Sequence, residues 1–380
     1  MAGRISRIIK RIRKGTGMTF LIDGHIDFAS TSLGRNRDYT RSVAEIRARE
    51  PENLINQATV GWPELQKGQV GIVFSTVFLD PPEHRTGPKI TGTSYDNKDE
   101  CHRSVLTQLD FYRRWQEEYP EKFKIILTKS DLDQTLSAWQ DTATEVSQQT
   151  HPVGLVILWE GAEGLRDYGD LDEYYERGLR IIGPVWGSGR WCGDFLSDPA
   201  DRFTPEGREL LAVMAEKKFV LDTAHMNTLS ANEALDRYEG IVIATHCNCR
   251  ALLKNPPNDR HFTDDTVARL VERDGVMGVL PFNGFLDTEW EIADPRNRVT
   301  LETLANHIDH ICQIAGNSRH AAIGTDSDGG FGYPAIPFEM NDISDLQKLE
   351  RILKNRGYSP DDVNRIFHGN WRRILERIFV

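Results

Sequence analysis

The sequence predicts an α/β protein built as a (β/α)8 barrel, with its functional site at the C-terminal ends of the strands. Three observations predict this fold: eight short apolar runs, amphipathic stretches between several of them, and polar side chains where the runs end. Continuous apolar strands that alternate with helices are typical of a parallel sheet covered by helices. Eight such units fit one barrel, whose usual length of about 200 to 400 residues accommodates this chain of 380.

The predicted strands are residues 19–27, 69–76, 154–161, 179–186, 219–225, 241–246, 275–282 and 321–328. Residues 204–218 and 262–274 are amphipathic and predict two of the helices between them. A further apolar run, 122–128, is placed outside the barrel, in the long insertion between the second and third strands. A doubly wound sheet is the rival architecture, but no G-x-G-x-x-G motif follows an early strand to support it.

Composition and charge exclude several classes of protein. Hydrophobic residues make up 39% and charged residues 27% of the chain, and the net charge of −11 argues against general nucleic-acid binding. No run approaches the roughly 18 apolar residues that a membrane-spanning helix needs. The five cysteines are irregularly spaced and the chain starts without an apolar signal segment, which predicts reduced thiols in a cytoplasmic protein.

The first 18 residues are expected to lie apart from the barrel. They are basic and carry isoleucines at helical spacing, which predicts a helix whose apolar stripe packs on the body. Binding to a membrane surface or to a polyanion is the alternative interpretation of this segment. Residues 19–380 are predicted to form a single barrel domain.

Polar residues stand where five of the predicted strands end. They are His25 and Asp27 on the first strand, Glu160 on the third, His225 on the fifth, His246 on the sixth and Asp326 on the last. Barrel enzymes assemble their sites on this rim from several strands. Taken singly, such a histidine can be a hydrogen-bonded junction residue, and such an acid can cap a helix or shape a turn. Six of them on one rim favour a common site.

The types of these residues point to metal binding. Three imidazoles and several carboxylates, with no thiolate among them, suit Zn²⁺ or a similar divalent ion. Five ligands before Asp326 are more than one ion needs, so we expect two ions with one bridging carboxylate. Two metals about 3.5–4 Å apart can share a water and lower its pKa towards about 7. An aspartate beside that water can carry its proton to a leaving group.

Longer stretches of the chain resemble a known family. They include LIDGHID, LVILWEGAEGL, FVLDTAHMN, IVIATHCNCRALLKNPPNDRHFTDD, GVMGVLPFNGFL, HIDHICQIAGNSRHAAIGTDSDGG and the terminal HGNWRRILERIF. In these segments, which run from about residue 19 to the end, the chain resembles the renal (membrane) dipeptidases. These are binuclear zinc peptidases of the amidohydrolase superfamily.

The resemblance implies a role for each rim residue. His25 and Asp27 become ligands of one metal ion. His225 and His246 become ligands of the second ion, and Glu160 becomes the bridging carboxylate. The remaining acid, Asp326, is implied to hold the amino group of the substrate and to pass the proton to the departing amine.

Two positions depart from the family pattern. The segment like RIIGPVW ends in a histidine in the dipeptidases, where it helps to stabilise the tetrahedral intermediate, whereas this chain has Trp186. The family also has an arginine, after the sixth-strand histidine, that pairs with the free carboxylate of the substrate. Simple spacing puts Pro257 there, and Arg260 fits if three residues are inserted. A guanidinium fork is suited to binding a carboxylate.

Other polar residues receive weaker assignments. Asn283 lies at the rim of the seventh strand and is a candidate substrate contact. Cys247 and Cys249 flank a predicted ligand, but C-x-C without a second pair is poor zinc spacing and predicts packing. Two histidines three residues apart, His307 and His310, are expected to face solvent. Asp328 is expected to fix the loop that carries the last predicted rim residue.

The resemblance therefore implies a metal-dependent dipeptidase. A bridging hydroxide would attack the peptide carbonyl, and the family accepts D-residues at the second position of the dipeptide. A homodimer is also implied by the family alone. Two alternatives stay open: another hydrolase on the same metal pair, acting on an N-acyl amino acid, a lactone or a cyclic amide, and a non-catalytic barrel.

Overall fold

The computed structural model describes residues 19–51, 56–85, 87–140 and 150–380. The predicted basic helix over residues 1–18 lies outside this described part of the chain. Within it, no helix combines the length and the apolar character needed to cross a lipid bilayer.

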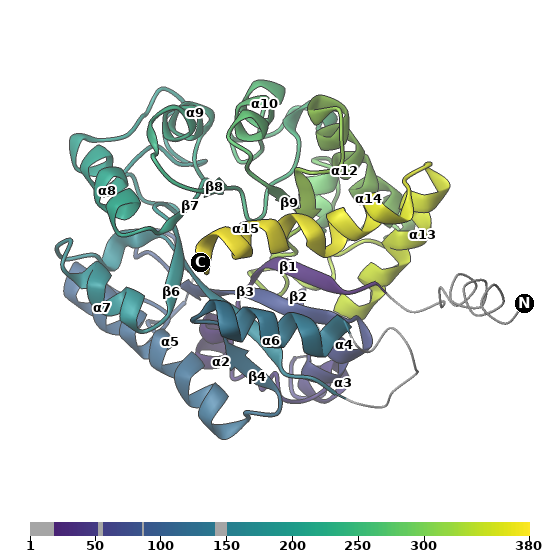
Figure 1. Cartoon of the computed structure of the whole chain (residues 1–380), viewed down its shortest axis with the longest axis horizontal. Coiled ribbons are helices and arrows are strands. Elements are labelled where there is room, and N and C mark those ends of the chain that lie inside the picture. Colours follow the sequence, from purple (N-terminus) through teal and green to yellow (C-terminus); the bar gives the residue numbers. More distant parts are fainter. Residues whose placement is uncertain (1–18, 52–55, 86, 141–149) are drawn as a thin grey trace, which may run out of the picture.

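Eight parallel strands form the barrel (Figure 1). They are β1 (Leu21–Ile26), β3 (Val70–Phe78), β5 (Val153–Glu160), β6 (Leu179–Gly183), β7 (Val220–Asp222), β8 (Val242–Ile243), β9 (Met277–Val279) and β10 (Ala321–Ile323). The first six pair in this order, and β9 pairs with β10. Isolated parallel bridges connect Ala244, directly after β8, with Met277 of β9, and Ser327, in the loop after β10, with Ile26 of β1. The pairing closes on itself, and the predicted barrel is confirmed.

Helices surround these strands and connect them. Their bounds are α2 (Phe28–Arg35), α3 (Val43–Arg47), α4 (Trp62–Lys67), α5 (Lys98–Glu118), α6 (Lys129–Gln140), α7 (Asp170–Glu176), α8 (Pro205–Glu216), α9 (Thr228–Arg237), α10 (Asp264–Glu272), α11 (Asn283–Leu286), α12 (Leu301–Ala315), α13 (Lys348–Asn355), α14 (Pro360–Asn364) and α15 (Asn370–Ile378). Side-chain caps explain several starts: Thr204 accepts from the Gly207 amide at α8, and Thr263 accepts from the Thr266 amide at α10. Both amphipathic stretches predicted as helices are confirmed.

Within the described residues, three short strands lie outside the ring. β4 (Phe123–Ile125) pairs with the first residues of β5, on the edge that β6 takes from Ile157 onwards. The run 122–128 therefore lies outside the barrel order, as expected. The other two, β2 (Asn56–Gln57) and β11 (Tyr333–Pro334), pair with each other in antiparallel orientation.

The last helix, α15, packs against β1 and β10 and crosses the centre of the view in Figure 1. Its Trp371 is fully buried, with its ring centroid 5.0 Å from that of Phe74. The indole N–H donates to the Ile323 carbonyl at 2.8 Å. A Cβ atom at Gly24 of β1 would lie 2.7 Å from the indole ring, so the strand needs glycine where Trp371 approaches it.

Candidate metal centre

The first two predicted ligands lie at the junction between β1 and α2. His25 is the fifth residue of the strand, and Asp27 is the N-cap residue of the helix, with φ −88° and ψ 64°. His25 Nε2 lies 3.5 Å from Asp27 Oδ2, and both residues are buried. The two side chains converge because the chain turns into the helix after Ile26. The alternation of side chains along a strand, which the spacing of His25 and Asp27 suggests, is therefore only part of the reason that they converge.

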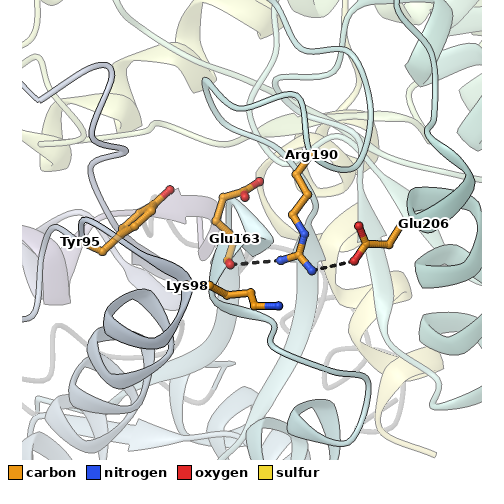
Figure 2. Close-up of a pocket in the computed structure, with 5 residues that line it drawn as sticks. All are labelled: Tyr95, Lys98, Glu163, Arg190 and Glu206. Carbon is orange, nitrogen blue, oxygen red and sulfur yellow. Dashed lines mark hydrogen bonds and ion pairs between the residues drawn. The ribbon is translucent and has the colours of Figure 1, made fainter.

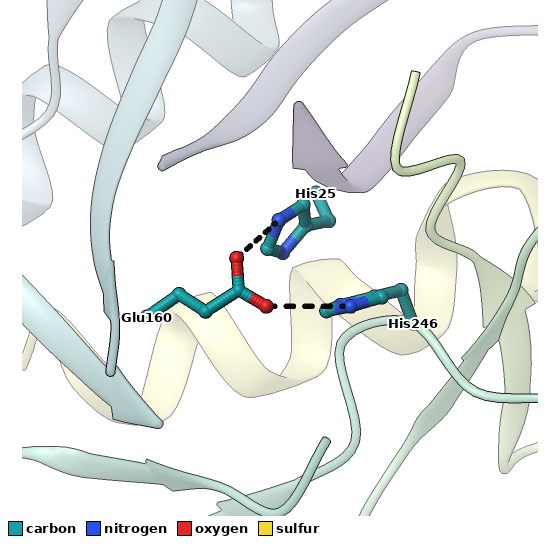
Figure 3. Close-up of side chains that lie close together, drawn as sticks. All are labelled: His25, Glu160 and His246. Carbon is teal, nitrogen blue, oxygen red and sulfur yellow. Dashed lines mark ion pairs between the residues drawn. The ribbon is translucent and has the colours of Figure 1, made fainter. Parts of the chain in front are cut away.

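Glu160, the last residue of β5, lies between the predicted histidine ligands (Figure 3). Its Oε2 atom is 3.5 Å from His25 Nε2, and its Oε1 atom is 3.7 Å from His246 Nε2. Oε1 also pairs closely with His225 Nε2. The two carboxylate oxygens thus face different imidazoles, which is the arrangement that a bridging ligand requires.

The other two histidines come from turns rather than from strands. His225 follows the end of β7 by three residues and has a positive φ of 67°. His246 follows the end of β8 by three residues, and the Nε2 atoms of the two rings are 2.7 Å apart. Both side chains are buried, so two nitrogen ligands are directed at one volume.

A hydrogen-bond chain behind His246 sets the orientation of its ring. The Thr245 hydroxyl donates to Asp222 Oδ2 at 2.5 Å, and the Thr245 amide donates to Asp222 Oδ1 at 2.9 Å. With its only proton used, the hydroxyl oxygen accepts from His246 Nδ1–H at 2.9 Å. Nε2 of His246 is therefore the unprotonated nitrogen, available to a metal ion. The sequence did not reveal this pair, although Asp222 and Thr245 both lie within three residues of a predicted ligand.

Asp326 completes the group from the other side of β1. It follows β10 in a left-handed turn with φ 52°, and its amide donates to the His25 carbonyl at 3.0 Å. Its Oδ1 atom lies 3.8 Å from His25 Nε2. This aspartate therefore faces the same volume as the ligands without a direct hydrogen bond to any of the imidazoles.

The neighbouring Asp328 holds the loop, as expected. It is fully buried and accepts from the amide and the hydroxyl of Thr59, both at 2.7 Å. The Tyr39 hydroxyl donates to its other oxygen at 2.9 Å, and Arg37 NH1 forms an ion pair with it at 3.2 Å. The loop after β10 is thereby tied to the segment that follows α2.

Burial and mutual charge shift the titration of the whole cluster. Burial lowers the pKa of His225 to about 4 and that of His246 well below its usual value. Burial raises the pKa of Asp326 well above its ordinary value. For Glu160, burial is outweighed by the charges of His225 and His25, which lower its pKa. For His25, burial is outweighed by the charges of Glu160 and Asp27, which raise its pKa well above the usual value. The neutral imidazoles of His225 and His246 are in the protonation state that metal binding needs, whereas His25 must lose a proton when a metal ion binds.

Several buried polar atoms in this cluster have no hydrogen-bond partner among the described residues. They are both ring nitrogens of His25 and the Nδ1 atom of His225. Two groups of three residues each bring their ligand atoms within 4.8 Å of one another. One group is His25, Glu160 and His246, and the other is His25, Asp27 and Asp326. Buried polar groups normally have partners, so unpaired donor atoms directed at a common volume fit one or two bound cations.

Two candidate substrate contacts lie on the β8–β9 side of the rim. Arg260 is 1% exposed, and its NH2 donates to the His246 carbonyl at 2.9 Å. Its Nε and NH1 have no hydrogen-bond partner in the described part of the chain, and neither does the side-chain amide group of the fully buried Asn283. Pro257, the position favoured by simple spacing, is exposed.

Trp186 lies in the loop after β6, which β7 separates from the β8–β9 side of the rim. It is half-buried, and its ring centroid is 6.2 Å from that of His225. The residue that departs from the family pattern therefore borders the metal-binding cluster.

Residues outside the cluster test the remaining predictions. His307 is buried, and its Nδ1 accepts from the Cys249 amide at 3.0 Å, so the prediction that it faces solvent is wrong. The error arose because the polar spacing on α12 does not show that this position turns towards the loop after β8. His310 is partly exposed and pairs with Asp264 at 2.8 Å. Cys247 and Cys249 are buried and free, consistent with packing.

A separate cavity of about 260 Å³ lies beside the loop that carries Trp186 (Figure 2). It is lined by Tyr95, Lys98, Glu163, Arg190 and Glu206. Arg190 NH1 donates to the Glu163 carbonyl oxygen at 3.3 Å, and its NH2 pairs with Glu206 at 2.8 Å. Burial raises the pKa of Glu163 to about 7. None of the predicted ligands lines this cavity.

Comparison with known proteins decides the family. The model of the membrane dipeptidase family (peptidase family M19) matches residues 9–379. The chain belongs to this family. Membership confirms the resemblance found in the sequence and the prediction of an enzyme of the metallo-dipeptidase class.

Individual relatives agree with this assignment. The chain is 24% identical over 362 residues to dipeptidase aclJ of Aspergillus oryzae, covering 93% of this chain and 77% of that protein. An uncharacterised protein of Klebsiella pneumoniae is 30% identical over 237 residues, covering 60% of this chain and 83% of that protein. The homodimer implied by the family stays a prediction.

Two solved structures share the fold. A metallopeptidase from Rhodobacter sphaeroides, solved with a phosphinate mimic of the dipeptide L-Ala-D-Ala, matches with a TM-score of 0.75 at 22% identity. The match covers 95% of this chain and 100% of that one. The probable dipeptidase PvdM from Pseudomonas aeruginosa matches with a TM-score of 0.73 at 16% identity, covering 100% and 99%.

Proposed function

We propose that this protein hydrolyses the peptide bond of dipeptides with two divalent metal ions, and that residues 19–380 act as one catalytic domain. The observation that carries the proposal is the position of Glu160, whose two oxygens face different histidines in a buried cluster with unpaired ligand atoms. Zn²⁺ is the ion that three imidazoles and carboxylates fit best. Two bound ions would supply an activated water, or bridging hydroxide, and would polarise the peptide carbonyl.

Asp326 is the proposed acid–base residue. It lies 3.8 Å from His25 Nε2, and burial raises its pKa well above the usual value, which favours uptake of a proton by the carboxylate. Such a group can pass the proton to the departing amine, a contribution of about 10²–10⁴ in rate. The same carboxylate would hold the free amino group of the substrate.

Arg260 is the proposed anchor of the substrate carboxylate. Two of its nitrogen atoms are buried without a hydrogen-bond partner among the described residues. The side-chain amide group of Asn283 is likewise buried and without a partner among them. A guanidinium group binds a carboxylate through two parallel hydrogen bonds. This anchor limits the substrate to short peptides with a free C-terminus, and a D-residue at that position is part of the proposal.

The half-buried Trp186 is the third proposed substrate contact. Its indole N–H is a donor near the cluster, in the place where the family has a donating histidine. The cytoplasm is the proposed location, since all five cysteines are buried and free of disulfides.

The first test combines metal analysis with hydrolysis of L,L and L,D dipeptides and of their C-terminally amidated forms. We expect about two zinc equivalents per chain, turnover of dipeptides, and loss of most activity on the amides. His225→Ala should lose metal and activity, whereas the matched control His310→Ala, at the surface, should keep both. A protein that retains no metal and regains none on addition of zinc would overturn the proposal. Equal turnover of free and amidated substrates would favour the other hydrolase classes.

A further inference from the structure

Four aromatic side chains form a continuous surface on one side of the metal centre, which we call the aromatic wall. Its members are Phe78, His84, Trp186 and Phe195. The Trp186 ring is the centre of the group: its centroid lies 5.0 Å from Phe78, 5.7 Å from His84 and 6.1 Å from Phe195. All four residues are partly exposed, so the wall offers apolar surface to a ligand.

The aromatic wall borders the predicted metal ligands directly. The Phe195 and His225 ring centroids are 5.4 Å apart, and those of Trp186 and His225 are 6.2 Å apart. The Phe195 amide also donates to the His225 carbonyl at 2.9 Å. A substrate whose scissile carbonyl lies at the metal centre therefore places one of its side chains within reach of these rings.

Backbone geometry fixes the position of the wall. His84 Nε2 lies 2.9 Å from the Gly187 carbonyl oxygen and joins the loop after β3 to the loop after β6. Gly187 has φ 66°, and a Cβ atom there would lie 2.5 Å from the His84 ring. Glycine therefore allows the imidazole to approach the residue next to Trp186. The wall is pre-formed, which lowers the entropic cost of binding a side chain against it.

The order of strands separates the wall from the proposed carboxylate anchor. Phe78 ends β3, and Trp186 and Phe195 follow β6. Arg260 and Asn283 follow β8 and β9, which are separated from β6 by β7 and from β3 by β10 and β1. With the C-terminal carboxylate at Arg260, the C-terminal residue occupies the β8–β9 side. The amino group near Asp326 then leaves the side chain of the N-terminal residue facing the β3–β6 side.

We propose that the aromatic wall is a specificity surface for the N-terminal residue of the dipeptide and selects an apolar or aromatic side chain there. The inference rests on the proposed dipeptidase activity and adds the substrate class to it. An apolar side chain that covers exposed rings removes apolar surface of both partners from water. Aromatic side chains gain further from edge-to-face contacts with the rings.

The test is a series of dipeptides with C-terminal alanine and N-terminal glycine, serine, aspartate, leucine or phenylalanine. We expect kcat/KM to rise by about 10- to 200-fold from the glycyl to the leucyl or phenylalanyl substrate. Phe195→Ala should reduce this ratio several-fold. Phe285→Leu is the matched control, since the Phe285 ring lies 5.6 Å from the Arg260 guanidinium, on the β8–β9 side. In this variant the ratio of kcat/KM between the leucyl or phenylalanyl substrate and the glycyl substrate should stay as in the wild type.

Trp186→Phe separates the wall from the indole donor. It keeps an aromatic ring and removes the N–H. The ratio of kcat/KM between the leucyl or phenylalanyl substrate and the glycyl substrate should therefore persist, while kcat falls for all substrates. Equal metal content and circular dichroism show that each variant is folded and loaded. Hydrolysis of the dipeptides without a preference for apolar N-terminal residues, or with a preference unchanged by Phe195→Ala, overturns the inference alone. Absence of hydrolysis of every dipeptide by the metal-loaded protein overturns the proposed function as well.

Discussion

Two neighbouring residues of β1, Gly24 and His25, face differently built regions of the molecule. Gly24 lies against Trp371, where the indole N–H has its acceptor and the amide of Asn370 donates to two carbonyl oxygens. His25 lies in the metal-binding cluster, where both of its ring nitrogens lack a hydrogen-bond partner among the described residues. Among the described residues, the named polar groups at the Trp371 contact have partners, whereas several polar atoms of the metal-binding cluster have none.

This difference indicates what each region contributes. Unpaired buried polar groups and close carboxylates cost stability and are retained where a ligand uses them. Saturated packing contributes stability and has no atoms left for chemistry. We therefore expect substitutions in the metal-binding cluster to change activity more than stability, and substitutions at the Trp371 contact to do the reverse.

The largest expected effect is on the rate, at Asp326. Asp326→Asn keeps the shape and removes the proton carrier, so kcat/KM for a dipeptide should fall by about 10²–10⁴-fold. The metal-free protein should be at least as stable as the wild type, because a neutral amide replaces a carboxyl group in a buried acidic cluster. Dipeptide kinetics, metal analysis and urea unfolding of the metal-free protein measure the three quantities. A large loss of stability with normal turnover would contradict the expectation that substitutions in the metal-binding cluster change activity more than stability.

Trp371→Ala should give the complementary result. Removal of a fully buried indole leaves a cavity and the Ile323 carbonyl without its donor. The expected loss is about 3–5 kcal/mol in the free energy of unfolding. The turnover per folded, metal-loaded molecule should stay within a few-fold of the wild type. Urea unfolding and active-site titration by metal content separate the two effects, and Trp371→Phe should lose less stability than the alanine variant.

Glu163→Gln should have a smaller effect. It extends the comparison to a half-buried carboxylate outside the proposed centre. Burial raises the pKa of Glu163 to about 7 from its ordinary 4.5, so the folded state binds the proton more tightly than the unfolded state. Ionisation therefore costs stability as pH rises from about 4.5 to about 7. At pH 8 the glutamine variant should be more stable by about 1–3 kcal/mol, and at pH 4.5 the difference should vanish.

Urea unfolding of both proteins across that pH range measures the difference, with metal loading held equal. If the difference in the free energy of unfolding between the variant and the wild type does not depend on pH, the carboxyl group of Glu163 titrates normally. The substitution lies outside the metal-binding cluster, so a change in metal content would instead show that the two sites are connected.

The sequence was sufficient for the strand order and for the identity of the clustered residues. Parallel strands reveal themselves by continuous apolar runs, and a barrel places the ends of all of them on one rim. The lengths of the individual strands were less predictable. The runs predicted at 241–246 and 321–328 contain only two and three strand residues. Apolar character records burial, whereas a strand also requires regular pairing.

The supporting contacts could not be predicted. His225 and Asp326 are non-glycine residues with positive φ, a conformation that no local pattern of side chains announced. The hydrogen bonds of Thr245 and Asp328 connect segments that are distant in sequence. The buried side of His307 faces a loop from another part of the barrel. Such contacts depend on which loops meet, and a single sequence carries no record of that.

The closure between β10 and β1 also sets the order in which the centre can be assembled during synthesis. Asp23 and Thr325 are 302 residues apart in the chain, and the Thr325 amide and hydroxyl both donate to the Asp23 carboxylate, at 2.8 and 2.7 Å. His25 and Asp27 leave the ribosome among the first residues of the domain, but the loop that faces them is among the last. The ring of strands therefore closes only when translation is nearly complete. All five proposed metal ligands precede residue 247, so the proposed acid–base residue Asp326 is the last member of the centre to be synthesised.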